Sequence, residues 1–221
     1  MENNEQRVFK NNGKRFEEDF KASLGEKVWA YRPSDTGGGL MSRFTSESLA
    51  DLFAFNIETK VLSIIELKST LGTSVSFKPY MQCMDYEKKK KQLDEWNSKQ
   101  TPMSRKKLKD EIKDKKKYIK GLYKETNQAM IKYHQIKSLM DIENKYDGEI
   151  KTYIAITFFK SNETYMITTK GFHEFWKTTN KKSINREDII KMIPSKKAYK
   201  IEQEYIRKTM KSKYKLGSLL G

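Results

Sequence analysis

The sequence predicts an α/β protein in which helices pack on a mixed sheet of about five strands and a basic helical segment is inserted into the chain. Apolar segments of strand character lie between segments of helical periodicity, and one long lysine-rich stretch interrupts them. The 221 residues are enough for one core with an appendage. We expect residues 1–84 and 126–200 to form a single domain, 85–125 the insertion and 201–221 a basic tail.

The first predicted helix spans residues 13–24. Phe16, Phe20 and Leu24 recur every fourth residue and would form one apolar stripe on it. Gly25 is expected to end the helix.

The next segment has strand character on both sides of a glycine-rich loop. A short strand is expected over 27–33, and a mobile loop at the consecutive glycines 37–39. Residues 50–56 and 61–70 are apolar and rich in β-branched and aromatic side chains, and they flank the polar residues 57–60. This pattern predicts a β-hairpin.

The composition changes over residues 85–125, which are highly charged, sparse in apolar residues and dominated by helix formers. A proline at position 102 divides the segment. We therefore predict two helices in a projecting hairpin, with too little apolar surface to form a domain alone.

The globular pattern then resumes. A helix is predicted over 127–141, and a second hairpin over 150–159 and 163–169. Two short helices are expected over 171–179, capped by Thr169, and over 186–193. The lysine-rich tail that follows is expected to be partly ordered.

The charge balance favours a polyanionic partner. The chain has 45 Lys and Arg against 29 Asp and Glu, which gives a formal net charge of +16 and a pI near 9.6. Nucleic acid is the partner we expect, because each neutralised phosphate releases a condensed counterion, although an anionic membrane surface fits the same surplus. The N-terminus has no apolar signal core and the chain has no long apolar run, so we expect a soluble, cytoplasmic protein that does not enter membranes.

Cysteine and histidine are too scarce for several kinds of site. Cys83 is the single cysteine, which excludes an internal disulfide and a cysteine-based zinc cluster, and His134 and His173 are the two histidines. A metal would therefore be held by oxygen ligands, which suits Mg²⁺, with Mn²⁺ able to substitute.

The predicted strand 61–70 carries charges inside an otherwise apolar segment. Side chains alternate along a strand, so Glu66 and Lys68 point to one face, and Asp51 at the start of the preceding strand could reach them across the hairpin. Two carboxylates can hold a divalent cation that activates water for phosphodiester hydrolysis, and a lysine can stabilise developing charge on phosphate. An ordinary ion pair on a surface strand would give the same pattern.

Asp51 followed by Glu66-Leu67-Lys68 resembles the PD-(D/E)XK nuclease signature. In order along the chain, the segments GKRFEEDF, SLADL, ELKST, SFKP, YHQIKSLM, TYIAITFF, NETYMITTKGFHEFW and KKSINREDIIKMIP are similar to the RecU family of Holliday junction resolvases of low-GC Gram-positive bacteria and their phages. These segments total 67 residues and are spread over residues 13–194 of the chain. The resemblance implies a restriction-endonuclease-like fold and metal-dependent resolution of branched DNA by a homodimer.

Carried over to this sequence, the resemblance implies metal ligation by Asp51 and Glu66, and a role for Lys68 at the attacking water or scissile phosphate. It further implies that Glu17 is an accessory acid and that Gln135 projects from a helix beside the site. A satisfied pair at the edge of the core is an alternative role for Gln135 and its neighbour His134. The adjacent acids Glu18 and Asp19 are expected to be solvated.

The sequence departs from the family in the position of its extra material. The family has a protruding stalk between the first strand and the catalytic acid, whereas this chain has only the glycine loop there and carries its insertion after the catalytic strand. We therefore expect the insertion to contact DNA, although a solvated charged face is the alternative. The candidate DNA-binding residues are Lys88, Lys89, Lys90, Lys91, Arg105, Lys106, Lys107, Lys113 and Lys117.

Two other functions fit the same residues. One is a restriction-like or repair endonuclease that acts on duplex or flapped DNA. The other is a non-catalytic basic DNA-binding protein, which would require no metal and would tolerate replacement of Asp51.

Overall fold

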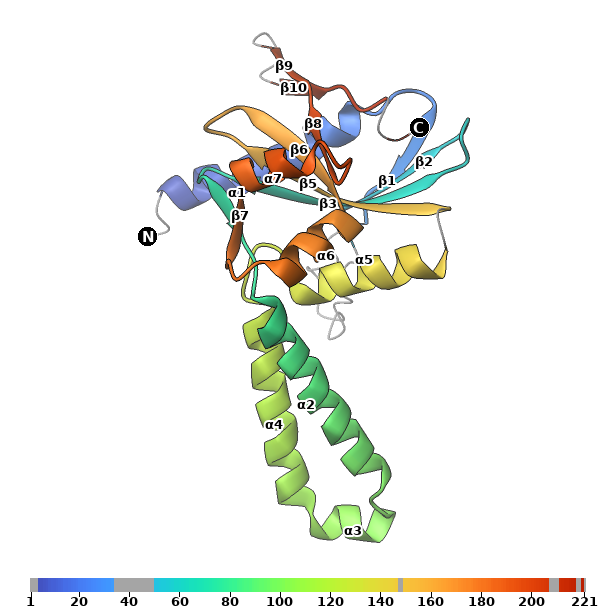
Figure 1. The fold of residues 1–221 in the computed structure, drawn as a ribbon, viewed down its shortest axis with the longest axis vertical. Helices are drawn as coiled ribbons and strands as arrows, with labels where there is room; N and C mark the ends of the chain where they lie inside the picture. The colour runs from blue at the N-terminus through green and yellow to red at the C-terminus, as the bar shows by residue number, and fades with distance from the viewer. Residues whose placement is uncertain (1–3, 34–49, 147–148, 207–210, 218–219, 221) are drawn as a thin grey trace.

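The computed structural model describes residues 4–33, 50–146, 149–206, 211–217 and 220. A mixed α/β body carries a long pair of helices that projects from one side (Figure 1). Within those described ranges, no helix combines the length and apolar character needed to span a membrane.

The body is built on a mixed sheet of six strands. Neighbouring strands are antiparallel except at the centre, where β3 and β5 run parallel. In spatial order the strands are β1 (Val28–Tyr31), β2 (Leu52–Asn56), β3 (Leu62–Thr70), β5 (Ile150–Phe158), β6 (Glu163–Thr168) and β8 (Ala198–Ile201).

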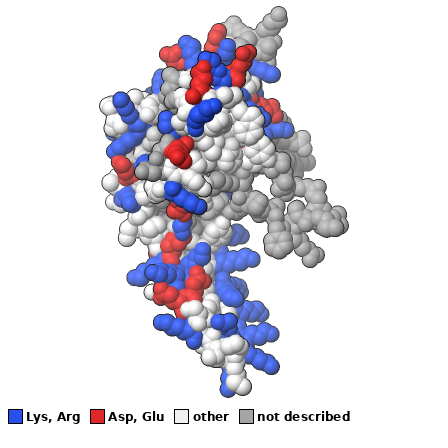
Figure 2. All heavy atoms as spheres, turned by 90° about the vertical axis from the view of Figure 1, so that its right-hand side faces the viewer, with Lys and Arg blue, Asp and Glu red and all other residues white. Residues whose placement is uncertain are grey.

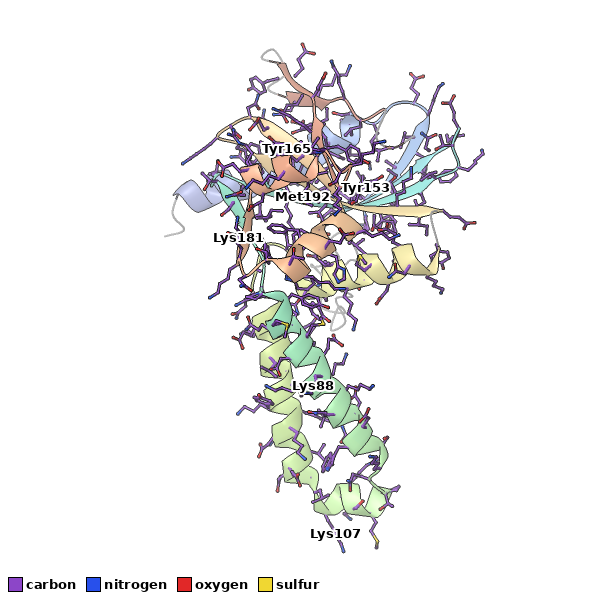
Figure 3. All side chains as sticks on the ribbon, in the orientation of Figure 1. Lys88, Lys107, Tyr153, Tyr165, Lys181 and Met192 are labelled. Atoms are coloured by element: carbon purple, nitrogen blue, oxygen red, sulfur yellow. The ribbon has the colours of Figure 1, made fainter. Side chains whose placement is uncertain are left out.

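Each face of the sheet packs against a different set of helices. Strand β5 shows the alternation, because Ile154 and Ile156 belong to one buried cluster while Tyr153 and Ala155 belong to the other. Figure 3 labels Tyr153 among the side chains of the body. The helix α1 (Asn4–Ala22) covers the Tyr153 face, and the opposite face is covered by α5 (Tyr133–Lys145), α6 (Thr169–Thr178) and α7 (Arg186–Met192).

The first helix begins earlier and ends earlier than its sequence pattern predicts. Phe16 and Phe20 are buried as expected, with 2% and 0% of their surface exposed, but α1 ends at Ala22 and Leu24 lies beyond it. Asp19 was expected to be solvated, and this prediction is wrong. Asp19 is 5% exposed because its Oδ2 accepts the backbone N–H of Ser212 at 2.9 Å.

Both predicted hairpins are present. The turn between β2 and β3 contains Lys60 with a φ of 62°, and the turn between β5 and β6 contains Asn162 with a φ of 51°. These left-handed conformations are the kind that asparagine tolerates well in tight turns. The predicted glycine loop at 37–39 lies outside the described residues.

The helix predicted over 127–141 instead begins at Tyr133. The preceding segment is tied to other elements, since the N–H of Ile131 donates to the carbonyl of Ser76 at 3.0 Å. Ser76 ends β4 (Ser74–Ser76), which pairs with β7 (Ser183–Asn185). Tertiary hydrogen bonds therefore override the local helical pattern here.

The cap of α6 is Thr168, one residue before the predicted Thr169. Thr168 Oγ1 accepts the N–H of Gly171 at 3.0 Å, while Thr169 is the first helical residue and is fully buried. Asn185 caps α7 in the same way, accepting the N–H of Asp188 at 2.9 Å.

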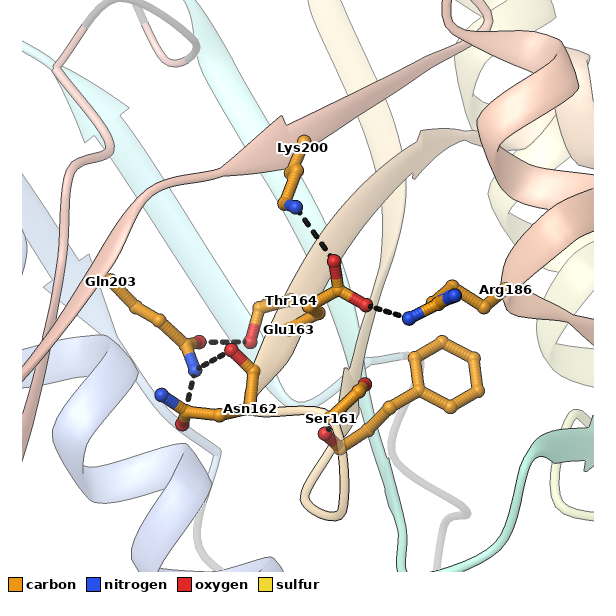
Figure 4. Close-up of polar contacts among 8 residues, drawn as sticks. Ser161, Asn162, Glu163, Thr164, Arg186, Lys200 and Gln203 are labelled. Atoms are coloured by element: carbon orange, nitrogen blue, oxygen red, sulfur yellow. Dashed lines mark hydrogen bonds and ion pairs between the residues drawn. The ribbon is translucent and has the colours of Figure 1, made fainter.

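The lysine-rich segment after Ser195 adds a sixth strand to the sheet, one more than the sequence predicts. After β8 the chain forms a hairpin of β9 (Gln203–Ile206) and β10 (Lys211–Tyr214). Strand β8 is joined to β6 and α7 by Glu163, whose carboxylate accepts from Lys200 at 2.6 Å and from Arg186 at 2.8 Å (Figure 4).

The projecting helices correspond to the predicted insertion and extend it by several residues at its start. They are α2 (Tyr80–Ser98), the short α3 (Pro102–Lys107) at the tip and α4 (Lys109–Thr126) (Figure 1). We refer to residues 80–126 as the arm. Thr101 caps α3 by accepting the N–H of Ser104 at 3.2 Å, which accounts for the break at Pro102.

Candidate functional site

The candidate site lies where β2 and β3 part. Their pairing ends at Leu52 opposite Ile65, so the second half of β3 extends beyond β2. Asp51, the residue just before β2, fills this gap, because its Oδ2 accepts the backbone N–H of Leu67 at 2.8 Å. The N–H and C=O of one strand residue point to the same side, so the Leu67 carbonyl faces this gap as well.

Glu66 is the buried acid of the site, with 0% of its surface exposed. Its Oε1 accepts a hydrogen bond of 2.6 Å from Nε2 of Gln135 on α5 and forms an ion pair with Lys68 Nζ. Its Oε2 is also buried and has no hydrogen-bond partner among the described residues. A buried carboxylate oxygen without a partner is unfavourable, and a cation would satisfy it.

The surroundings of Glu66 raise its pKa from 4.5 to about 7. Burial is the largest cause, because it penalises the charged form, and the negative charge of Asp51 adds to it. The ion pair with Lys68 and the hydrogen bond from Gln135 oppose the increase. Lys68 does not fully compensate the buried charge, so a further positive charge would favour the ionised form of Glu66.

These donors fit a hard divalent cation. Asp51 and Glu66 would supply carboxylate oxygens and Leu67 a backbone carbonyl, which are the ligands that Mg²⁺ and Mn²⁺ prefer. Across the described ranges, no group of three or more His, Cys, Asp or Glu side chains is placed to hold a metal. The remaining coordination positions would have to be filled by water or by substrate oxygens.

Glu17, the predicted accessory acid, does not join Asp51 and Glu66 in a cluster of three possible metal ligands within the described ranges. It lies on α1 and its carboxylate forms an ion pair with Arg32, just after β1. Its neighbour Glu18 is exposed, as predicted. A role for Glu17 in the site stays a prediction.

Gln135 and His134 have different surroundings although they are adjacent. Gln135 is 8% exposed and touches Glu66 directly. His134 instead contacts Asn127, whose Oδ1 lies 2.7 Å from His134 Nδ1 and accepts its backbone N–H at 3.2 Å. Sequence reasoning missed Asn127, because the contact depends on where α5 begins and no local pattern signals that.

The nine predicted DNA-binding residues all lie on the arm, but they do not share one environment. Lys89 pairs with Asp85 at 2.6 Å and Lys91 with Glu95 at 3.8 Å. Arg105 donates to the carbonyl of Asn97 at 3.2 Å. The others are exposed and form no salt bridge within the described ranges, with Lys88 and Lys107 labelled in Figure 3. They are Lys88, Lys90, Lys106, Lys107, Lys113 and Lys117.

Comparison of the chain with protein-family models and with curated proteins found no match.

Proposed function

We propose that this protein is a metal-dependent endonuclease that resolves four-way or other branched DNA, with Asp51, Glu66 and Lys68 at its catalytic centre. One observation carries the proposal: Glu66 is fully buried beside a second acid, with one oxygen unpartnered among the described residues and a raised pKa. Such an arrangement is unfavourable in a merely structural ion pair and suits a cation site.

The proposal includes a restriction-endonuclease-like fold. The described order supports it, since α1 is followed by the β2–β3 hairpin that carries the motif and β5 then pairs in parallel with β3. The formal charge of +16 supports a nucleic acid as the partner.

Each residue of the centre has a distinct task in this mechanism. Bound Mg²⁺, with Mn²⁺ able to replace it, would polarise the scissile phosphate and lower the pKa of the attacking water. Gln135 fixes the Glu66 carboxylate through its 2.6 Å hydrogen bond. Lys68, whose side chain is 16% exposed, can donate to a phosphate oxygen and stabilise the charge that develops there.

Resolution of a four-way junction requires cuts in two strands related by symmetry. One centre per chain supplies one cut, so the proposal includes a homodimer with two-fold symmetry. Two centres would then face equivalent strands of the junction.

The test compares two substrates of matched sequence, a labelled four-way junction and a linear duplex, with Mg²⁺ and with EDTA. We expect paired symmetric nicks in the junction only when Mg²⁺ is present. Equal cutting of both substrates would retain the nuclease and discard junction selectivity. Tight binding without any metal-dependent cutting would leave a non-catalytic DNA-binding protein.

A further inference from the structure

The lysines of α4 are sorted onto one side of the helix. At 3.6 residues per turn, six of them fall within an arc of about 100°. All four acids of α4 fall outside that arc. We call the six residues the α4 lysine track, and they are Lys109, Lys113, Lys116, Lys117, Lys120 and Lys124.

The track is free of the contacts that hold the arm together. Its six lysines are exposed and form no salt bridge within the described ranges. The other lysine of α4, Lys115, differs in both respects, because it pairs with Glu111 at 2.7 Å and lies 3.7 Å above the ring of Trp96. The hollow between α2 and α4 is lined by residues such as Leu93, Trp96 and Ile119 and by no track lysine.

The arm carries a large net positive charge. Residues 80–126 contain fifteen Lys and Arg against eight Asp and Glu, which leaves seven positive charges in excess. Figure 2 shows Lys and Arg side chains projecting along much of the arm, with the acidic side chains of that view gathered toward its upper part. A surface of this kind attracts a polyanion.

The spacing of the track suits the backbone of duplex nucleic acid. From Lys109 to Lys124 the helix rises by about 22 Å, with at least one track lysine on nearly every turn of about 5.4 Å. A duplex presents one phosphate charge per ~1.7 Å of its axis, so several phosphates lie within reach of the flexible lysine stems. Contacts of this type position DNA without reading its sequence.

The end of the track is tied to the candidate site. Asn127, just after α4, donates from Nδ2 to the carbonyl of Tyr123 at 2.9 Å and accepts the N–H of His134 at 3.2 Å. The rings of Tyr123 and His134 stack with their centroids 6.2 Å apart. The next residue is Gln135, which bonds Glu66 at 2.6 Å. Helix α2 packs on α6, where the rings of Tyr80 and Trp176 lie 5.1 Å apart, and it also contacts α5 through the ion pair of Glu87 with Lys137 at 2.9 Å.

We propose that the α4 lysine track binds the phosphate backbone of one duplex limb of branched DNA and directs that limb toward Glu66. This inference rests on the proposed function for the identity of the substrate. The physical basis is that α4 carries an aligned row of exposed cations and that its end is joined through Asn127 to the turn that holds Gln135 on Glu66. Helix α2 also contacts α5, but its lysines 88–91 are consecutive, so they point to different sides of the helix and form no such row.

The test removes four charges from the track and four from elsewhere on the arm, and it measures binding to the labelled junction in EDTA over a range of salt concentrations. Glutamine and lysine have similar helix propensities, so both variants should keep their helices. The track variant combines Lys113→Gln, Lys116→Gln, Lys117→Gln and Lys120→Gln. The control combines Lys88→Gln, Lys90→Gln, Lys99→Gln and Lys107→Gln, which are also exposed and form no salt bridge within the described ranges. Three of these lysines are among the nine candidates from the sequence, and the inference differs from that prediction in expecting the α4 lysine track to contribute more to binding than they do.

We expect the slope of log affinity against log salt to become shallower by about three to four in the track variant, at ~0.9 for each lost phosphate contact. Affinity at low salt should fall by at least about 100-fold in the track variant, and by less than about tenfold in the control. Replacing the same four track lysines with arginine should keep wild-type affinity. Equal losses in the two glutamine variants would overturn the inference.

Two further measurements distinguish a membrane partner from DNA, and failure of the track inference from failure of the proposed nuclease activity. Binding to vesicles of anionic phospholipid is measured alongside, and a track variant that loses vesicle binding but keeps DNA binding would overturn the inference in favour of a membrane surface. Junction cutting by the wild-type protein in Mg²⁺ tests the nuclease independently. Absence of cutting together with a shallower track slope would reject the nuclease and retain the track.

Discussion

Replacing Glu66 with glutamine should stabilise the metal-free protein above neutral pH. The folded protein holds the Glu66 carboxyl in a fully buried position beside Asp51, and its pKa is raised from 4.5 to about 7. A folded-state pKa above the unfolded value favours the fold at low pH. That contribution is complete below about pH 4.5 and is lost as the pH rises through about 7.

The size of the effect follows from the same two values. A rise from 4.5 to about 7 corresponds to about 3 kcal/mol, at about 1.4 kcal/mol for each unit of pKa. The wild-type protein in EDTA should therefore lose about 3 kcal/mol of unfolding free energy between about pH 4.5 and 8 through this group alone. The variant Glu66→Gln cannot ionise there and should not show this loss.

The assay is urea unfolding of the wild-type protein and Glu66→Gln in EDTA at several pH values from about 4 to 8. The informative quantity is the difference in unfolding free energy between the two proteins as a function of pH, because titrating groups away from Glu66 contribute equally to both. We expect the difference to shift by about 3 kcal/mol in favour of the variant as the pH rises. A difference that stays constant with pH would refute the reasoning.

Four other predictions concern separate parts of the fold and site. Mg²⁺ should raise the melting temperature of the wild-type protein and not that of Asp51→Asn, measured by thermal unfolding, because a ligand of the folded state stabilises it. The variant Gln135→Ala should reduce metal affinity or the cutting rate by about 10- to 100-fold through loss of orientation of Glu66, measured by Mg²⁺ titration of single-turnover cutting. Gly171→Ala should destabilise the fold by at least about 1 kcal/mol in urea unfolding, because a Cβ there would lie 2.6 Å from a side-chain carbon and 2.8 Å from a backbone oxygen. Glu163 is partly desolvated, but its two cationic partners hold its pKa at about 2. The variant Glu163→Gln should therefore have a lower free energy of unfolding than the wild-type protein near neutral pH. This difference should disappear as the pH falls from about 4.5 through 2, measured by acid and urea unfolding.

The parts of the fold that sequence predicts best are those specified by local pattern. The β2–β3 hairpin is readable because apolar strands flank a polar turn, and strand alternation places Glu66 and Lys68 on one face. The arm is readable for a similar reason, since helix formers dominate it and Pro102 marks its break.

The parts that sequence misses depend on contacts between distant residues. Asp19 is buried because the backbone of Ser212, 193 residues away, donates to it. Strand β8 has only four residues, too few for a clear alternating pattern, so its pairing with β6 identifies it as a strand, which its local sequence does not. The contact between Gln135 and Glu66 depends on the start of α5, which tertiary hydrogen bonds set six residues later than the helical pattern indicates.

The most direct test of the proposed catalytic centre is single-turnover cutting of a labelled four-way junction in Mg²⁺ by the wild-type protein, Asp51→Asn and Glu66→Gln, each at saturating concentration. Glu202→Gln, an exposed acid that pairs with Lys215 at 2.7 Å between β8 and β9, serves as the matched control for loss of a carboxylate. We predict that the wild-type protein and the control cut the junction, whereas both site variants bind it without cutting. Cutting by Asp51→Asn or Glu66→Gln at the wild-type rate would contradict the account.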